Sequence, residues 1–82
     1  MKTELKPIYA NVKSFYNKAD VKQFDNKIQL FSYNTLVCEI INNKAFVYNI
    51  HSQTTLKHVK EFLLQNGFKA ESKKQILEDY FI

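Results

Sequence analysis

The residues best suited to chemistry in this sequence are His58, Glu61 and Thr55, which fall in one segment with helical periodicity. His58 precedes Glu61 by three positions, so the two side chains project from neighbouring places on a helix. A histidine beside a carboxylate and a hydroxyl could act as a general base. Such catalysis also needs a cleft, a nucleophile and an orienting partner, and the sequence supplies only Glu61 as a neighbour. We therefore expect an exposed binding histidine and no enzymatic activity, with a small enzyme built on His58 as the least favoured alternative.

Metal and thiol chemistry are not indicated by the remaining candidate residues. His51 and His58 have no cysteine or carboxylate cluster that would complete a zinc site, so no cofactor is expected. Cys38 is the only cysteine. It stands in a row of apolar residues without a neighbouring base, which predicts a buried core thiol.

Alternating apolar residues between Asp20 and Ile50 predict an antiparallel meander. Asn and Asp tolerate positive φ, so they mark its turns at Asp25-Asn26, Tyr33-Asn34 and Asn42-Asn43. We expect a three-residue loop at 33–35 and a two-residue turn at Asn42-Asn43, with Leu30 opposite Cys38 and Ile40 opposite Ala45. The predicted strands are residues 20–24, 27–32, 36–41 and 45–50.

The alternation gives the predicted sheet two different faces. One face is aliphatic or small and suits helix packing; it comprises Val21, Ile28, Leu30, Leu36, Cys38, Ile40, Ala45 and Val47. The other face mixes aromatic residues with lysines, as interface anchors commonly do. Its candidate binding residues are Phe31, Phe46, Tyr48, Lys22 and Lys44. A terminal helix covering this face as a second core layer is the alternative.

Helical segments are expected on both sides of the meander. Pro7 can open a helix of about three turns, because Leu5, Ile8, Val12, Phe15 and Tyr16 recur at helical spacing. A longer helix is predicted over 54–66 and ends at Gly67, with Lys57, His58 and Glu61 on its exposed side. Ser72 to Gln75 reads as a capping box before a short helix. The expected fold class is α+β, with an N-terminal helix, a four-stranded antiparallel meander, then one long and one short C-terminal helix.

Length and composition restrict the possible functions. The 82 residues are expected to form a single domain spanning 1–82, and without a leader or an apolar run long enough to cross a membrane a cytoplasmic location is expected. The net charge is +4, and all 12 basic residues are lysine. Without arginine the chain lacks the side chain that most often makes bidentate contacts with phosphate or guanine.

Three groups of residues resemble a family of short uncharacterised proteins carried by phages and prophages of Gram-positive bacteria. They are Lys13-Ser14-Phe15-Tyr16-Asn17-Lys18-Ala19, Ser32-Tyr33-Asn34-Thr35-Leu36-Val37, and the run from Ser52 to Leu63 followed by Gln65-Asn66-Gly67-Phe68. The resemblance implies an accessory factor that acts in the host cytoplasm. Such factors often bind host machinery, and some inhibit bacterial defence systems, as anti-CRISPR proteins do. The family has no assigned catalytic residues to carry over.

Two binding functions follow from this reading. The first is a non-enzymatic module that binds a host protein, such as a defence nuclease or its complex, through the aromatic sheet face or through Lys57, His58 and Glu61. The second is a nucleic-acid-binding module in which the aromatic side chains stack on bases and the lysines meet phosphates. A homodimer formed through the aromatic face is also compatible with the sequence.

Overall fold

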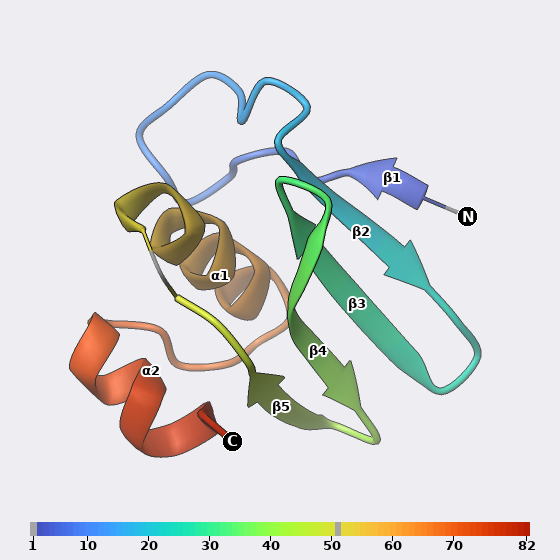
Figure 1. Ribbon diagram of the computed structural model, residues 1–82, viewed down its shortest axis with the longest axis vertical. Coiled ribbons are helices and arrows are strands. Elements are labelled where there is room, and N and C mark those ends of the chain that lie inside the picture. Colours follow the sequence, from blue (N-terminus) through green and yellow to red (C-terminus); the bar gives the residue numbers. More distant parts are fainter. Residues whose placement is uncertain (1, 51) are drawn as a thin grey trace.

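The computed structural model describes residues 2–50 and 52–82, and within them a five-stranded antiparallel sheet is followed by two helices (Figure 1). The strands lie in chain order across the sheet, and each pairs with its neighbour. The elements are β1 (Lys2–Glu4), β2 (Ala19–Gln23), β3 (Lys27–Ser32), β4 (Thr35–Ile41), β5 (Lys44–Val47), α1 (Gln53–Gln65) and α2 (Lys73–Tyr80).

The expected N-terminal helix and four-stranded sheet are wrong. Residues 2–4 form a fifth strand, in which Thr3 pairs with Val21 of β2. The following residues 5–18, which we call the β1–β2 loop, contain no helix. Tyr16 and Asn17 have φ of 53° and 62°, and the N–H of Lys18 donates to the carbonyl of Phe15 at 3.0 Å, so a tight turn precedes β2. Helical spacing of apolar residues therefore did not produce a helix in this segment.

The predicted meander register is confirmed, although one turn differs from the expected form. Ile40 pairs with Ala45, and Leu30 pairs with Cys38. The turn after β3 has two residues, Tyr33 and Asn34, both with positive φ, instead of three. A β-bulge between Leu30 and Phe31 compensates for the missing residue, because two residues of one strand then oppose one of its partner.

The bulge also changes which residues of β4 face the core. Leu36 pairs with Phe31 and is half-buried, whereas Val37 is 2% exposed. The prediction had placed Leu36 in the aliphatic row, and alternation along the strand then put its neighbour Val37 on the opposite, aromatic face. Leucine and valine thus exchange their expected positions at this point of the strand.

The ends of α1 follow from local residue chemistry. The side chain of Ser52 accepts a hydrogen bond from the backbone N–H of Thr55 at 3.1 Å, which caps the N-terminus. Gly67 has φ of 83° just after the helix, where a residue with a side chain would be strained. The N–H of Gly67 donates to the carbonyl of Leu64, and that of Phe68 donates to the carbonyl of Leu63. These two bonds form a Schellman motif.

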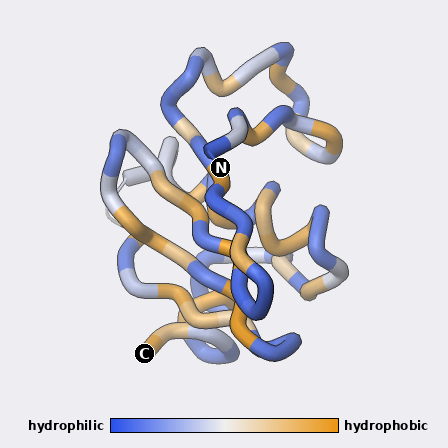
Figure 2. Tube along the Cα trace, turned by 90° about the vertical axis from the view of Figure 1, so that its right-hand side faces the viewer, coloured by the Kyte–Doolittle hydropathy of each residue, from blue (hydrophilic) through white to orange (hydrophobic). Residues whose placement is uncertain are grey.

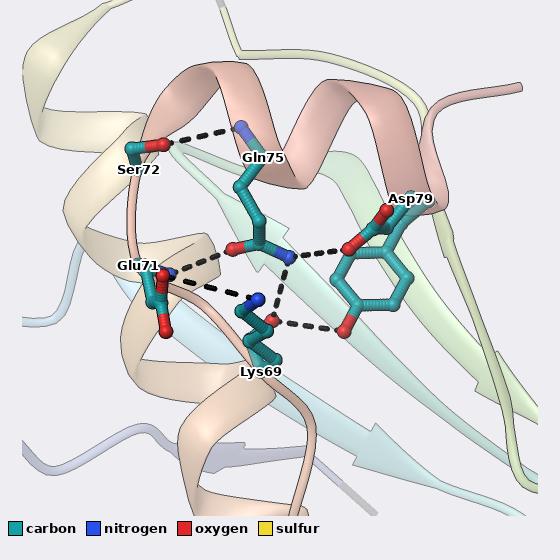
Figure 3. Close-up of polar contacts among 6 residues, drawn as sticks. Lys69, Glu71, Ser72, Gln75 and Asp79 are labelled. Atoms are coloured by element: carbon teal, nitrogen blue, oxygen red, sulfur yellow. Dashed lines mark hydrogen bonds and ion pairs between the residues drawn. The ribbon is translucent and has the colours of Figure 1, made fainter.

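Gln75 joins α2 to the segment before it (Figure 3). Its Nε2 donates to the carbonyl of Lys69 and to Asp79 Oδ2, at 3.2 and 2.8 Å, and its Oε1 accepts from the N–H of Glu71 at 2.7 Å. Ser72 caps the helix by accepting from the Gln75 N–H. The expected capping box therefore forms in part, since the amide of Gln75 contacts Glu71 and not Ser72.

One hydrophobic core lies between the aliphatic sheet face and the helices. Leu30, Cys38 and Val47 are 0% exposed on the sheet, and Val59 and Leu63 are 0% exposed on α1. Figure 1 shows both helices on the same side of the sheet, with the β1–β2 loop next to α1. No helix in the described part of the chain is long and apolar enough to span a membrane.

Candidate functional site

The carboxylate of Glu61 binds the β1–β2 loop. It accepts hydrogen bonds from three consecutive backbone N–H groups: Ile8 to Oε2 at 2.8 Å, Ala10 to Oε1 at 2.7 Å, and Tyr9 to both oxygens at 3.1 Å. The side chain of Gln65 also donates to Oε2 at 2.6 Å. Successive N–H groups that converge in this way form an anion-binding nest.

Glu61 therefore has a structural role that the sequence did not indicate. It is 1% exposed, although it was expected on the solvated side of its helix. Burial raises its pKa, but the hydrogen bonds from Gln65 and the three backbone N–H groups outweigh burial and lower it below its usual value. Glu61 is thus an ionised anchor for the loop, and its predicted exposure is wrong.

His58 is also buried, contrary to its predicted exposure. It is 1% exposed, its Nδ1 lies 2.8 Å from Ser32 Oγ, and the ring of Phe15 packs edge-on against it with centroids 4.7 Å apart. Burial lowers the pKa of His58, and the nearby charge of Lys18 lowers it further. Ser32 is only 2% exposed, so this serine and histidine pair lies inside the core.

The β1–β2 loop carries four of the eight exposed large hydrophobic side chains among the described residues. Ile8, Tyr9, Val12 and Tyr16 are 70%, 61%, 43% and 71% exposed, and we call these four residues the loop surface. Figure 2 shows hydrophobic and hydrophilic stretches alternating along this loop, at the top of the molecule. Lys6, Lys13 and Lys18 of the same loop are also exposed.

A cavity of about 370 Å³ opens between this loop and α1, and we call it the lysine cavity. Its charged residues are Lys57, which is exposed as predicted, Lys60 and the buried Glu61. The ion pairs found in the described ranges are Lys2 with Asp20 and Lys69 with Glu71, so neither lysine of the cavity has a carboxylate within 4.0 Å. The other lining residues are Tyr9, Ala10, Asn11, Val12, Leu64 and Ala70.

The aromatic sheet face is separate from the loop surface. Phe31, Phe46 and Tyr48 are all half-buried, and both helices lie on the opposite side of the sheet. Lys22 Nζ lies 5.1 Å from the centroid of the Phe31 ring, and Lys44 is exposed at the end of β5. These five predicted residues thus share one surface.

A polar network fixes the middle of this aromatic face. The hydroxyl of Tyr48 donates a short hydrogen bond to Glu39, which also accepts from Gln29 Nε2 at 3.1 Å. Burial raises the pKa of Tyr48 to about 12, with a further contribution from the hydrogen bond to Glu39. The ring of Tyr48 is therefore held in place, and its hydroxyl stays protonated at neutral pH.

The remaining thiol and metal predictions concern Cys38 and the two histidines. Cys38 is 0% exposed, and burial raises its pKa to about 12, so the thiol lies in the core as expected. Among residues 2–50 and 52–82, no three His, Cys, Asp or Glu side chains lie close enough to hold a metal ion. His51 lies outside the described residues.

Residues 3–78 match the model of a family of unknown function, DUF8033. The chain belongs to this family. The DUF8033 match covers all of the sheet except Lys2, the whole β1–β2 loop, α1, and α2 as far as Glu78, so the site described above lies within the family domain. No curated protein and no solved structure matches the chain.

Sequence reasoning missed the loop surface and found only part of the lysine cavity. Lys57 was predicted as a binding residue, but Lys60 and the loop residues were not. Three of the four residues of the loop surface, Ile8, Val12 and Tyr16, were assigned to a buried helix stripe, because their spacing fits a helix as well as a loop. Pro7 gave no signal against this helix, because proline is tolerated in the first turn of a helix.

Proposed function

We propose that the protein is a non-enzymatic module that binds a partner protein through the loop surface. The observation that carries this proposal is the exposure of Ile8, Tyr9, Val12 and Tyr16 on a loop that Glu61 holds at three backbone positions. Exposed apolar side chains on an anchored loop favour association, because burying them releases water and little conformational freedom is lost.

Charge selects the kind of partner. The loop contributes Lys6, Lys13 and Lys18, and Lys57 and Lys60 lie beside it on α1. The carboxylate of Glu61 is occupied by the backbone N–H groups of residues 8–10, so it neutralises little of the positive charge that these lysines present to solvent. An acidic surface on the partner would complement the lysines and accelerate its association.

Aliphatic side chains favour a protein over a nucleic acid at this surface. Ile8 and Val12 cannot stack on bases or bind phosphates, whereas a protein can bury both in an apolar hollow. A non-enzymatic role is supported by the burial of His58 and Ser32, which lack a path to a substrate. The finer proposal, a phage-borne factor acting on a host protein such as a defence nuclease, depends on the resemblance alone.

Site-specific photo-crosslinking tests the proposal. A benzophenone amino acid replaces Tyr9 or Tyr16, and Phe24, which is 46% exposed in the turn after β2, serves as the matched control position. In cells that naturally contain the protein, we expect one polypeptide adduct at positions 9 and 16, insensitive to nuclease, and none at 24. No adduct, or equal adducts at all three positions, would contradict the proposal.

Nucleic-acid binding by the aromatic sheet face is the second candidate. It is favoured by the half-buried rings of Phe31 and Phe46 with Lys22 and Lys44 on the same surface. Fluorescence anisotropy with a labelled single strand at low salt tests it: Phe31→Ala should weaken binding severalfold, and affinity should fall steeply as salt rises. No binding at low salt would exclude this candidate.

A further inference from the structure

The lysine cavity has the size and the composition of a ligand site. Its volume of about 370 Å³ falls in the usual range for small-molecule pockets, which is roughly 300–1,000 Å³. Ala10, Leu64 and Ala70 provide an apolar lining, and polar groups occur at the ends of Lys57, Lys60 and Asn11. This combination suits a ligand that has an apolar part and a polar, negatively charged part.

The charge balance of the cavity is positive despite the presence of Glu61. Both oxygens of Glu61 accept hydrogen bonds from N–H groups of the loop, and Oε2 also accepts from Gln65. Lys57 and Lys60 are three residues apart on α1, so their ammonium groups can converge on one anion. Neither has an acidic partner within the described ranges.

The walls of the cavity are fixed by contacts remote from it. Glu61 sets the position of the loop at Ala10, and Gln75 binds the backbone on both sides of Ala70, at the Lys69 carbonyl and the Glu71 N–H (Figure 3). The hydroxyl of Tyr80 also donates to the Lys69 carbonyl at 2.8 Å. A preformed site loses little conformational entropy when a ligand enters it.

We propose that the lysine cavity binds a carboxylate that neighbours an apolar side chain, as in an acidic aromatic segment of a partner protein. The carboxylate contacts Lys57 and Lys60, and the apolar side chain lies against Leu64 and Ala70. This inference deepens the proposed function, because it names the chemistry of the partner segment that would enter beside the loop surface.

A second hollow, of about 480 Å³, lies between β1, β2 and α1 and suits this ligand less well. Its charged lining residues are one lysine and one glutamate, Lys6 and Glu4, so it has no net charge. The anionic part of the ligand therefore distinguishes the two hollows.

Titration of the purified protein with two small probes, followed by amide NMR shifts, tests the inference. N-acetylphenylalanine carries a carboxylate beside an aromatic ring, and N-acetylphenylalanine amide is the matched uncharged probe. We expect the acid to shift the amides of Ala10, Leu64 and Ala70 with a dissociation constant of about 1–10 mM, which is usual for a ligand of this size. The uncharged probe should bind about fivefold or more weakly, because it lacks the charge-assisted hydrogen bonds.

Two lysine variants complete the test. The double variant Lys57→Gln/Lys60→Gln should lower the affinity for the acid to that for the amide, whereas Lys73→Gln/Lys74→Gln, which changes two exposed lysines of α2, should leave it unchanged. Equal binding of both probes, or shifts confined to residues outside the cavity, would overturn the inference. Both probes act on the isolated protein, so this outcome is independent of the crosslinking result at Tyr9 and Tyr16.

Discussion

Glu61 accepts a hydrogen bond at 2.7 Å from the backbone N–H of Ala10, a residue 51 positions earlier in the chain. Together with the bonds from Ile8 and Tyr9, this contact lets one side chain of α1 define the path of a loop without secondary structure of its own. The candidate binding surface therefore depends on a carboxylate that is itself only 1% exposed.

Replacing this carboxylate should release the loop. In Glu61→Gln we expect the free energy of unfolding to fall by about 2–4 kcal/mol, because an amide offers one acceptor oxygen and turns an NH₂ group toward backbone donors. Urea denaturation measures the loss, and hydrogen exchange at residues 8–10 should accelerate. Glu78→Gln, on the exposed side of α2, is the control and should change neither. Unchanged exchange at residues 8–10 in Glu61→Gln would contradict the anchoring role.

Acid should destabilise the protein through two buried groups of α1. The pKa of His58 is lowered from 6.5, and that of Glu61 is lowered from 4.5, so the unfolded chain binds more protons than the folded one at both sites. Stability should be fully present above pH 6.5 for His58 and above pH 4.5 for Glu61, and be lost as the pH falls through each lowered pKa. Urea denaturation at a series of pH values measures this. In His58→Gln the part of the loss that begins near pH 6.5 should shrink; an identical profile would refute the contribution of His58.

The buried side chains of Ser32 and His58 should be energetically coupled through their hydrogen bond. Ser32→Ala removes the partner of His58 Nδ1, and Nε2 is already unpaired among the described atoms, so we expect a loss of about 1–3 kcal/mol. A double-mutant cycle with His58→Leu should give a smaller combined loss than the sum of the two single losses. Strictly additive losses would show that the two side chains do not interact.

The side chain of Gln75 should stabilise the fold, because it binds the backbone of the segment before α2 at Lys69 and Glu71. Gln75→Leu leaves the Lys69 carbonyl and the Glu71 N–H without this partner, and we expect a loss of about 1–2 kcal/mol, measured by thermal unfolding. Gln53→Leu, at the exposed start of α1, is the matched control and should change stability by less than about 0.5 kcal/mol. Equal effects of the two substitutions would argue against the network drawn in Figure 3.

Features governed by neighbouring residues were predictable from the sequence. The pairing of Ile40 with Ala45 follows from the two-residue turn between β4 and β5. Ser52 and Ser72 cap the starts of the two helices, and Gly67 ends α1, all by contacts within a few residues. Even the three-residue loop, which was wrong, left the register correct, because the bulge supplies the residue that the turn lacks.

The predictions that were wrong concern features that depend on contacts between segments distant in the sequence. A polar residue on a helix is expected in water, yet Glu61 is buried because donors near residue 9 meet it, and His58 because Ser32 meets it. Without those partners both side chains would be costly to bury. The contacts of Glu61 also fix a non-helical path at residues 8–10, so they account both for the missing helix and for the misplaced Glu61, whereas the burial of His58 depends on the separate contact with Ser32.

The contact between the last residues and β5 bears on self-association. Phe81 bridges in parallel to Val47, and the N–H of Ile82 donates to the Val47 carbonyl at 3.2 Å. An open margin of a sheet can recruit strands from other molecules and start amyloid growth. At the opposite margin β1 has only three residues and carries Lys2, and short charged strands recruit poorly. The last residues thus cover part of one margin and the other ends in a short charged strand, so we expect neither margin to recruit a strand readily, although apolar side chains are exposed on the loop.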